Sequence, residues 1–204
     1  MAFPSNSVDL SALVKAQAEI LGQEQKVLTA ARLAINHGAR KGLTMAVDQI
    51  TREYVVQPSY IRKHLMVNPA SGARQEAIII GNHRETLIDR FAKPITHSVA
   101  VKHPRRSKGN RRAGIPAGRK MAGITTQVRR GNAHRWRSAF WLPLRKGNQG
   151  GGNGLGVAIR DGRKLKVLHT ISVAQIWRRV RGEILPDVQA EAETEFNRQI
   201  ARLL

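Results

Sequence analysis

The feature that most constrains how this chain folds is a long segment rich in cations and free of acids. Residues 90–160 contain seventeen Lys and Arg side chains and no Asp or Glu. Folding brings these like charges together unless an anionic partner neutralises them. The whole chain has 204 residues and a formal net charge of +21 at pH 7. An acidic partner is therefore part of any explanation of its function.

Two classes of anionic partner fit this charge. Duplex DNA or RNA is the first, because each phosphate that pairs with Lys or Arg releases counterions and strengthens binding. An anionic membrane is the second, but it requires a basic helix with an apolar opposite face, whereas the basic segment here has the pattern of strands and loops. No apolar run approaches roughly eighteen residues, and the N-terminus lacks the pattern of a signal peptide. We therefore expect a soluble protein without a membrane partner.

The length and composition suggest one domain, residues 1–204, made in a reducing cytoplasm. A chain of this length supports one sizeable core. It contains no cysteine, which excludes disulfides and thiolate metal sites.

The first part, residues 1–68, is predicted to be helical. Apolar residues recur at three- and four-residue steps from Leu10 to Leu21, and this helix should end near Gly22. A second apolar stripe predicts a helix from about Glu24 to Tyr54, roughly 45 Å long at about 1.5 Å per residue. Gly38 and Gly42 lie on one face of it, which favours close packing against a neighbouring backbone over a functional hinge.

A short basic helix should follow, with Pro58 at its first turn and residues 59–67 in its body. Its basic residues form either a solvated face or a nucleic-acid contact.

Residues 76–170 are predicted to form an antiparallel sheet, which makes the fold class α+β. The period changes from helical to alternating after Gly72. The sequence predicts a hairpin in which Asp161 and Gly162 are the central residues of a type I′ turn. The other expected strands are residues 77–80, 96–102 and 135–142.

Two loops interrupt this sheet. The basic loop, residues 103–122, contains two prolines and three glycines and little that could enter a core, so we expect it to be mobile until a partner orders it. The glycine-rich loop, residues 147–156, has the composition of a linker and lacks the glycine spacing of a phosphate site. The basic loop carries the candidate nucleic-acid or partner contacts, Arg105, Arg106, Lys108, Arg111, Arg112, Arg119 and Lys120.

Residues 171–204 are predicted to form a C-terminal helical segment, interrupted near Pro186. Five of the fourteen acids of the chain lie in it, between residues 183 and 195. They form either a solvated face with weak ion pairs to Arg198 and Arg202, or a face that docks against the basic surface of a neighbouring copy. The candidate subunit-interface residues are Glu183, Asp187, Glu191 and Glu195.

We expect no enzymatic activity, no metal and no cofactor. Seven histidines supply imidazoles, but their spacing fits no metal motif, and residues 90–160 contain no carboxylate to partner a base. The histidines are His37, His64, His83, His97, His103, His134 and His169.

The order of several segments resembles the minor tail protein Z family of lambda-like phages. The resemblance covers nearly the full length and is poorest in the two loops, and the basic residues here are more interrupted by Gly, Asn and Pro than the arginine runs of that family. No single motif is diagnostic. The segments that carry it are residues 34–40 (AINHGAR), 47–55 (VDQITREYV), 60–65 (YIRKHL), 131–136 (GNAHRW) and 171–196.

The resemblance implies a structural virion protein of a long-tailed phage, made in the host cytoplasm and placed in the tail or neck. It implies a tail-completion ring, a homo-hexamer, at the head–tail junction. Its expected neighbours are tail-terminator, tail-tube or head-connector proteins, with non-specific contact to genomic DNA, and the family brings no catalytic residues.

The alternative function is a monomeric RNA- or DNA-binding protein of the ribosomal-protein type. Such a protein would also use basic loops that order on phosphate, without reading sequence. The apolar stripe of residues 27–54 and the acid-rich final helix favour protein assembly.

Overall fold

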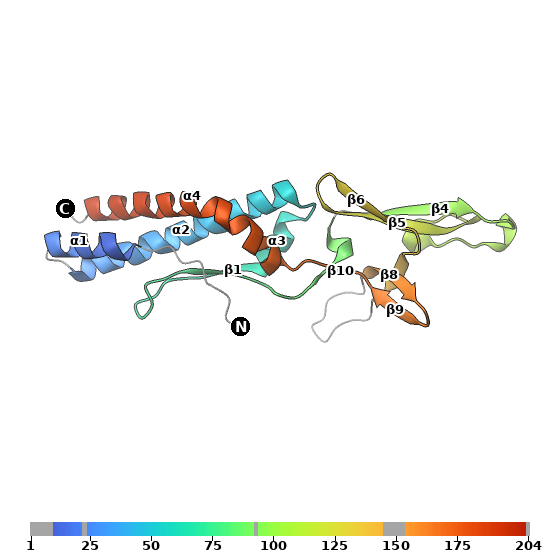
Figure 1. Ribbon diagram of the computed structural model, residues 1–204, viewed down its shortest axis with the longest axis horizontal. Helices are drawn as coiled ribbons and strands as arrows, with labels where there is room; N and C mark the ends of the chain where they lie inside the picture. The colour runs from blue at the N-terminus through green and yellow to red at the C-terminus, as the bar shows by residue number, and fades with distance from the viewer. Residues whose placement is uncertain (1–9, 22–23, 92–93, 145–153, 203–204) are drawn as a thin grey trace. The chain divides into compact units, whose positions relative to one another are not determined.

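The computed structural model describes residues 10–21, 24–91, 94–144 and 154–202 (Figure 1). It has the expected α+β class, with a long N-terminal helix, small antiparallel sheets and a C-terminal helix. Contacts within the chain gather into two compact units. Unit 1 comprises Met1–Ile50, Pro58–His83 and Ser172–Leu204, and unit 2 comprises Thr51–Gln57 and Arg84–Ile171. The expectation of a single domain stays a prediction.

Unit 1 is built from helices and one β-hairpin. Its core is made mainly by α2 and α4, and includes Val27, Ile35, Phe196 and Ile200. Leu10 packs in the same core. The elements of unit 1 are α1 (Ser11–Leu21), α2 (Glu24–Glu53, whose last turn belongs to unit 2), α3 (Pro58–His64), β1 (Leu65–Asn68), β2 (Ile78–Gly81) and α4 (Val173–Ala201).

The predicted close packing at the helix glycines is confirmed. A Cβ atom on Gly38 would lie 2.8 Å from the Cβ of Ala192, and one on Gly42 would lie 2.9 Å from a methyl carbon of Val188. Both contacts are shorter than van der Waals packing allows. The two glycines therefore let α2 and α4 approach closely, side by side in Figure 1.

The expected break at Pro186 is wrong, because α4 is one continuous helix with Pro186 inside it. Its start is strongly specified: the Ser172 hydroxyl accepts from the Gln175 backbone N–H, and the Gln175 side chain accepts from the Ser172 N–H, which forms a capping box. The apolar side chains before and after Pro186 are buried. Their burial outweighs the loss of one backbone hydrogen bond.

The short basic helix ends earlier than predicted. Residues 65–67 belong to β1 and not to α3. They pair antiparallel with β2, Met66 lying opposite Ile80. The predicted helix of residues 59–67 was too short for its apolar spacing to distinguish helix from strand. The pairing with β2 decides that residues 65–67 form a strand.

The described residues of unit 2 form three small antiparallel sheets, with strand orders β10-β3, β4-β5-β6 and β7-β8-β9. Ile88, Ile124, Ala139, Val157 and Leu168 form its core. Its elements are β3 (Thr86–Leu87), η1 (Ile88–Arg90), β4 (Ile95–Ala100), η2 (Pro104–Arg106), η3 (Arg111–Ala113), β5 (Arg119–Arg129), β6 (Asn132–Trp136), β7 (Phe140–Pro143), β8 (Leu155–Asp161), β9 (Lys164–Val167) and β10 (His169–Thr170).

The predicted hairpin is confirmed as β8 and β9, but its turn is displaced by one residue. Asp161 pairs with Lys164, so Gly162 and Arg163 are the central residues. Gly162 has a φ of 57°, the left-handed conformation that such a turn needs at its first central position.

The predicted strand of residues 135–142 is wrong, because a turn at residues 137–138 divides it. Trp136 ends β6, which pairs with β5, and Phe140 begins β7, which pairs with β8. Alternation continues through the break, so the sequence pattern alone does not reveal that the chain changes sheets.

Candidate nucleic-acid or partner interface

The basic loop has a defined backbone structure. We call residues 101–118, which connect β4 to β5, the basic tip. Two 3₁₀ turns, η2 and η3, lie within it. Asn110 and Ile115 exchange backbone hydrogen bonds of 2.8 and 2.9 Å, and the base of the tip is closed by the Val101 N–H, which donates to the Gly118 carbonyl at 3.0 Å.

Local capping and three glycines make this structure possible. The side chain of Asn110 accepts from the Ala113 N–H at 3.2 Å. Gly109, Gly114 and Gly118 have φ values of 67°, 66° and 79°, which L-residues with a Cβ adopt at a cost. A Cβ on Gly109 would lie 2.5 Å from the carbonyl oxygens of residues 115 and 116.

The basic tip thus has local structure of its own, and the expectation that it stays mobile until a partner orders it stays a prediction. Its backbone groups bond one another over short range, and Ala113 and Ile115 are buried at 6% and 5% exposure. Sequence reasoning missed Asn110 as the organising residue. The sequence does contain a signal for this role. Asn is a common capping residue at the start of a turn, and Gly114, four residues later, suits the end of that turn.

The predicted contact residues divide between the tip and the strand that follows it. Residues 119–122 begin β5, so Arg119 and Lys120 lie beyond the loop. Arg119 donates from Nη2 to the Ser98 carbonyl at 2.7 Å and from Nε to the Ser98 hydroxyl at 2.8 Å. Its guanidinium thus helps to hold β4 against β5. Arg112 lies in η3, and the structure does not describe its side chain.

Four cations of the basic tip project into solvent. Arg105, Arg106, Lys108 and Arg111 are all exposed. Among the residues that the structure describes, none of these four side chains forms an ion pair with a carboxylate. A positive charge without a local partner is available to a phosphate or to an acidic protein face.

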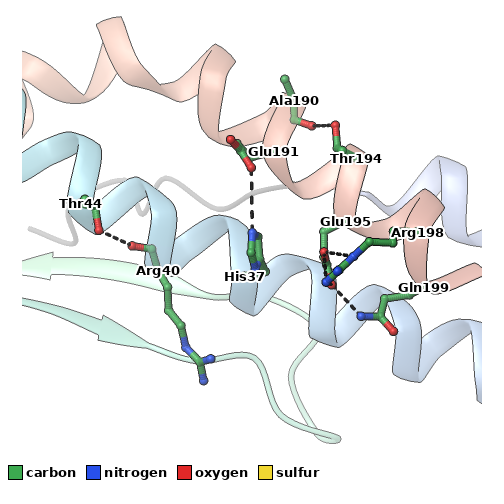
Figure 2. A network of polar contacts seen from close by, with 9 residues as sticks. All are labelled: His37, Arg40, Thr44, Ala190, Glu191, Thr194, Glu195, Arg198 and Gln199. Atoms are coloured by element: carbon green, nitrogen blue, oxygen red, sulfur yellow. Dashed lines mark hydrogen bonds and ion pairs between the residues drawn. The ribbon is translucent and has the colours of Figure 1, made fainter.

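The acidic side chains of α4 are not equivalent. Glu183 and Asp187 are exposed, and Glu183 accepts a hydrogen bond from the Gln49 side chain at 2.7 Å. Glu191 is half-exposed and lies 3.9 Å from the His37 imidazole on α2 (Figure 2). Glu183 and Asp187 are thus the predicted interface residues most accessible to a partner.

Glu195 is committed to contacts within its own unit. The residue is 7% exposed, and its carboxylate accepts two hydrogen bonds of 2.8 Å from the Arg198 guanidinium and one of 2.6 Å from Gln199 (Figure 2). The bonds from Arg198 and then Gln199 lower the pKa of Glu195 to about 2. We therefore leave Glu195 out of the interface proposed below.

The glycine-rich loop lies largely outside the described residues, which resume at Gly154. Leu155 and Gly156 belong to β8.

Other kinds of site have little support in the described part of the chain. The described residues include no group of three His, Asp or Glu side chains placed to hold a metal ion. A small apolar hollow in unit 1, between α2, β2 and α4, has a volume of about 20 Å³, the room of about one water molecule. None of the described helices combines the length and the hydropathy needed to cross a membrane.

Comparisons with protein family models, curated proteins and solved structures find no match to this chain.

Proposed function

We propose that this chain is a structural virion protein of a long-tailed phage, a tail-completion or neck component that joins tail to head and contacts the DNA path. Copies of the chain form a six-fold ring at the head–tail junction. Tail-terminator, tail-tube or head-connector proteins are its neighbours. The proposal starts from the resemblance of segments 34–40, 47–55 and 131–136 to the minor tail protein Z family.

The observation that carries the proposal is the exposed basic tip. Its backbone forms its own hydrogen bonds, and four of its cations project into solvent, where phosphates or acidic side chains of a partner can reach them. Their role is positional and electrostatic. Phosphate contacts fix a protein on DNA without reading its sequence, so we expect no base specificity.

The amount of charge limits how much of it DNA uses. A ring roughly 40 Å tall encloses about 24 phosphates of duplex DNA at about 1.7 Å per charge. The copies of a ring, each with a formal charge of +21, supply far more positive charge than that. Most cations of the chain therefore face acidic surfaces of neighbouring proteins or solvent.

Two variants that each replace four cationic side chains by Gln test this role in phage particles. The tip variant carries Arg105→Gln, Arg106→Gln, Lys108→Gln and Arg111→Gln. The control removes the same charge from the exposed cations of the β8–β9 hairpin in the same unit, through Arg160→Gln, Arg163→Gln, Lys164→Gln and Lys166→Gln.

We expect the tip variant to leave unjoined heads and tails, or joined particles that lose DNA, when particles are counted by electron microscopy. The control should join tails as the unmodified chain does. A folded tip variant that joins and retains DNA normally would contradict the role of the tip. Absence of the chain from purified particles would contradict the virion assignment and favour the monomeric nucleic-acid-binding alternative.

A further inference from the structure

The outer face of the β4-β5-β6 sheet carries apolar side chains in solvent. Ile95, His97 and Val99 alternate along β4 and share this face, because His97 Nε2 lies 2.7 Å from the Thr125 hydroxyl. The opposite face is directed to the core, where Thr96 accepts a hydrogen bond from Trp141. Ile95 is 62% exposed and Val99 is 42% exposed. Exposed apolar groups on one sheet face, among cations, are typical of an interaction surface.

Cations flank these apolar residues. Lys120 lies directly opposite Val99, and Thr125 lies between Ile95 and Arg135 across the three strands. Residues opposite one another on neighbouring strands point to the same face. Lys120 and Arg135 are both exposed. We call Ile95, His97, Val99, Lys120, Thr125 and Arg135 the outer sheet face.

A stripe on α4 has the complementary character. Glu183, Asp187, Ala190 and Thr194 follow one another at steps of four, three and four residues, so they share one side of the helix, and all four are exposed. Figure 2 shows Ala190 and Thr194 on the side of α4 turned away from α2. At the other end of the stripe, the exposed Glu183 carboxylate also accepts a hydrogen bond of 2.7 Å from Gln49 of α2. We call these four residues the acidic stripe. It is acidic at its beginning and small, without bulky side chains, at its end.

The two surfaces agree in length as well as in charge. From Glu183 to Thr194 the helix rises about 16 Å at 1.5 Å per residue. From Ile95 to Val99 the strand rises about 13 Å at 3.3 Å per residue. Ala190 and Thr194 lie about 6 Å apart along the helix axis. Their small side chains allow the helix to lie close over one of the two apolar residues, Ile95 or Val99, as helices do on sheet faces.

We infer that the outer sheet face of one copy binds the acidic stripe of α4 from a second copy. This contact joins different surfaces of the two copies and is therefore head-to-tail, so it propagates into a ring where the rotation closes. The inference rests on the proposed function, because it supplies the contact between neighbouring subunits of the ring.

Charge reversal tests the inference on the full chain. The first variant, Lys120→Glu with Arg135→Glu, makes the sheet face acidic. The second, Glu183→Lys with Asp187→Lys, makes the stripe basic. A control, Lys164→Glu with Lys166→Glu, makes the same charge change as the first on exposed residues of β9. Assembly is measured by sedimentation velocity, and folding by circular dichroism.

We expect the unmodified chain and the control to assemble, and each reversed variant alone to remain a monomer. Mixing the two reversed variants should restore assembly, because each then offers a surface opposite in charge to a surface of the other. A chain that carries all four reversals should assemble with itself.

Two outcomes would overturn the inference. The first is an unmodified chain that stays monomeric, and the second is a mixture of folded reversed variants that does not assemble. Suppose that the mixture does not assemble, while the unmodified chain forms rings and is found in particles. The proposed function then stands and only this interface is wrong. If the chain is absent from particles, the proposed function fails, whatever the mixture does.

Discussion

Glu195 is a buried carboxylate on α4 whose charge is stabilised by Arg198 and Gln199. Its pKa is lowered from 4.5 to about 2 in the folded protein. A lowered pKa stabilises the folded state at pH values above the unfolded pKa, and this contribution is lost as the pH falls through the folded value. The stabilisation from Glu195 is thus complete above about pH 4.5 and disappears towards about pH 2.

We predict that Glu195→Gln lowers the free energy of unfolding by about 2 kcal/mol at neutral pH, the typical size of a hydrogen bond to a charged group. The difference from the unmodified chain should shrink as the pH falls from 4.5 towards 2. Urea unfolding, monitored by circular dichroism at several pH values, measures this difference in the free energy of unfolding. Glu193→Gln, at an exposed carboxylate of the same helix, is the control and should change stability by less than about 0.5 kcal/mol. A difference that persists unchanged at pH 2 would contradict the assignment.

Gly109 and Gly114 make a second residue-scale test, within the basic tip. Both have positive φ, so Ala at either position pays about 1 kcal/mol or more of backbone strain. Only at Gly109 would the new Cβ collide with backbone oxygens, whereas nothing lies within 4 Å at Gly114. We predict that Gly109→Ala opens the tip, seen as faster amide hydrogen exchange in residues 109–115, and that Gly114→Ala leaves exchange there closer to normal. Equal protection in both variants would show that the close approach at Gly109 is unimportant.

At the scale of elements, the packing of α2 against α4 depends on the absence of a side chain at Gly38. We predict that Gly38→Val destabilises the protein by at least about 1–3 kcal/mol, because the new methyl groups meet Ala192 and the backbone of Val188. Gly182 is a helical glycine on α4 with open space around its Cβ position, so Gly182→Ala should stabilise the helix by up to about 1 kcal/mol. Thermal unfolding of the two variants measures both changes in stability. A neutral Gly38→Val would mean that α2 and α4 separate without cost.

At the scale of the whole molecule, the charge of the basic tip predicts how DNA binding responds to salt. Each phosphate contact contributes about 0.9 to the slope of log affinity against log salt. The four-residue tip variant should therefore reduce this slope by up to about 3.6 for duplexes of any sequence. The β8–β9 variant of equal charge change should reduce it less. Equal losses would show that net charge alone, and not the tip, governs binding.

The sequence by itself determined the elements whose signals are local and periodic. The long helix α2, the helical character of the C-terminal segment, the close packing at Gly38 and Gly42, and the β8–β9 hairpin followed from apolar spacing and glycine chemistry, because these features are decided within a few residues. The sequence also determined the charge of residues 90–160, from which we predict an anionic partner.

Only the tertiary structure decided which of several local possibilities occurs. Apolar burial on both sides carried α4 through Pro186, and pairing with different neighbours separated β6 from β7. Among the predicted site residues, the structure separated the buried Glu195, which bonds Arg198 and Gln199, and Arg119, which bonds Ser98, from the exposed Asp187 and the exposed cations of the tip. Glu183 is intermediate, because it is exposed and also accepts a hydrogen bond from Gln49. The same types of charged residue occur among the buried or bonded residues and among the exposed ones. The difference arises from distances between residues far apart in the chain, or from side-chain contacts that no periodic pattern encodes.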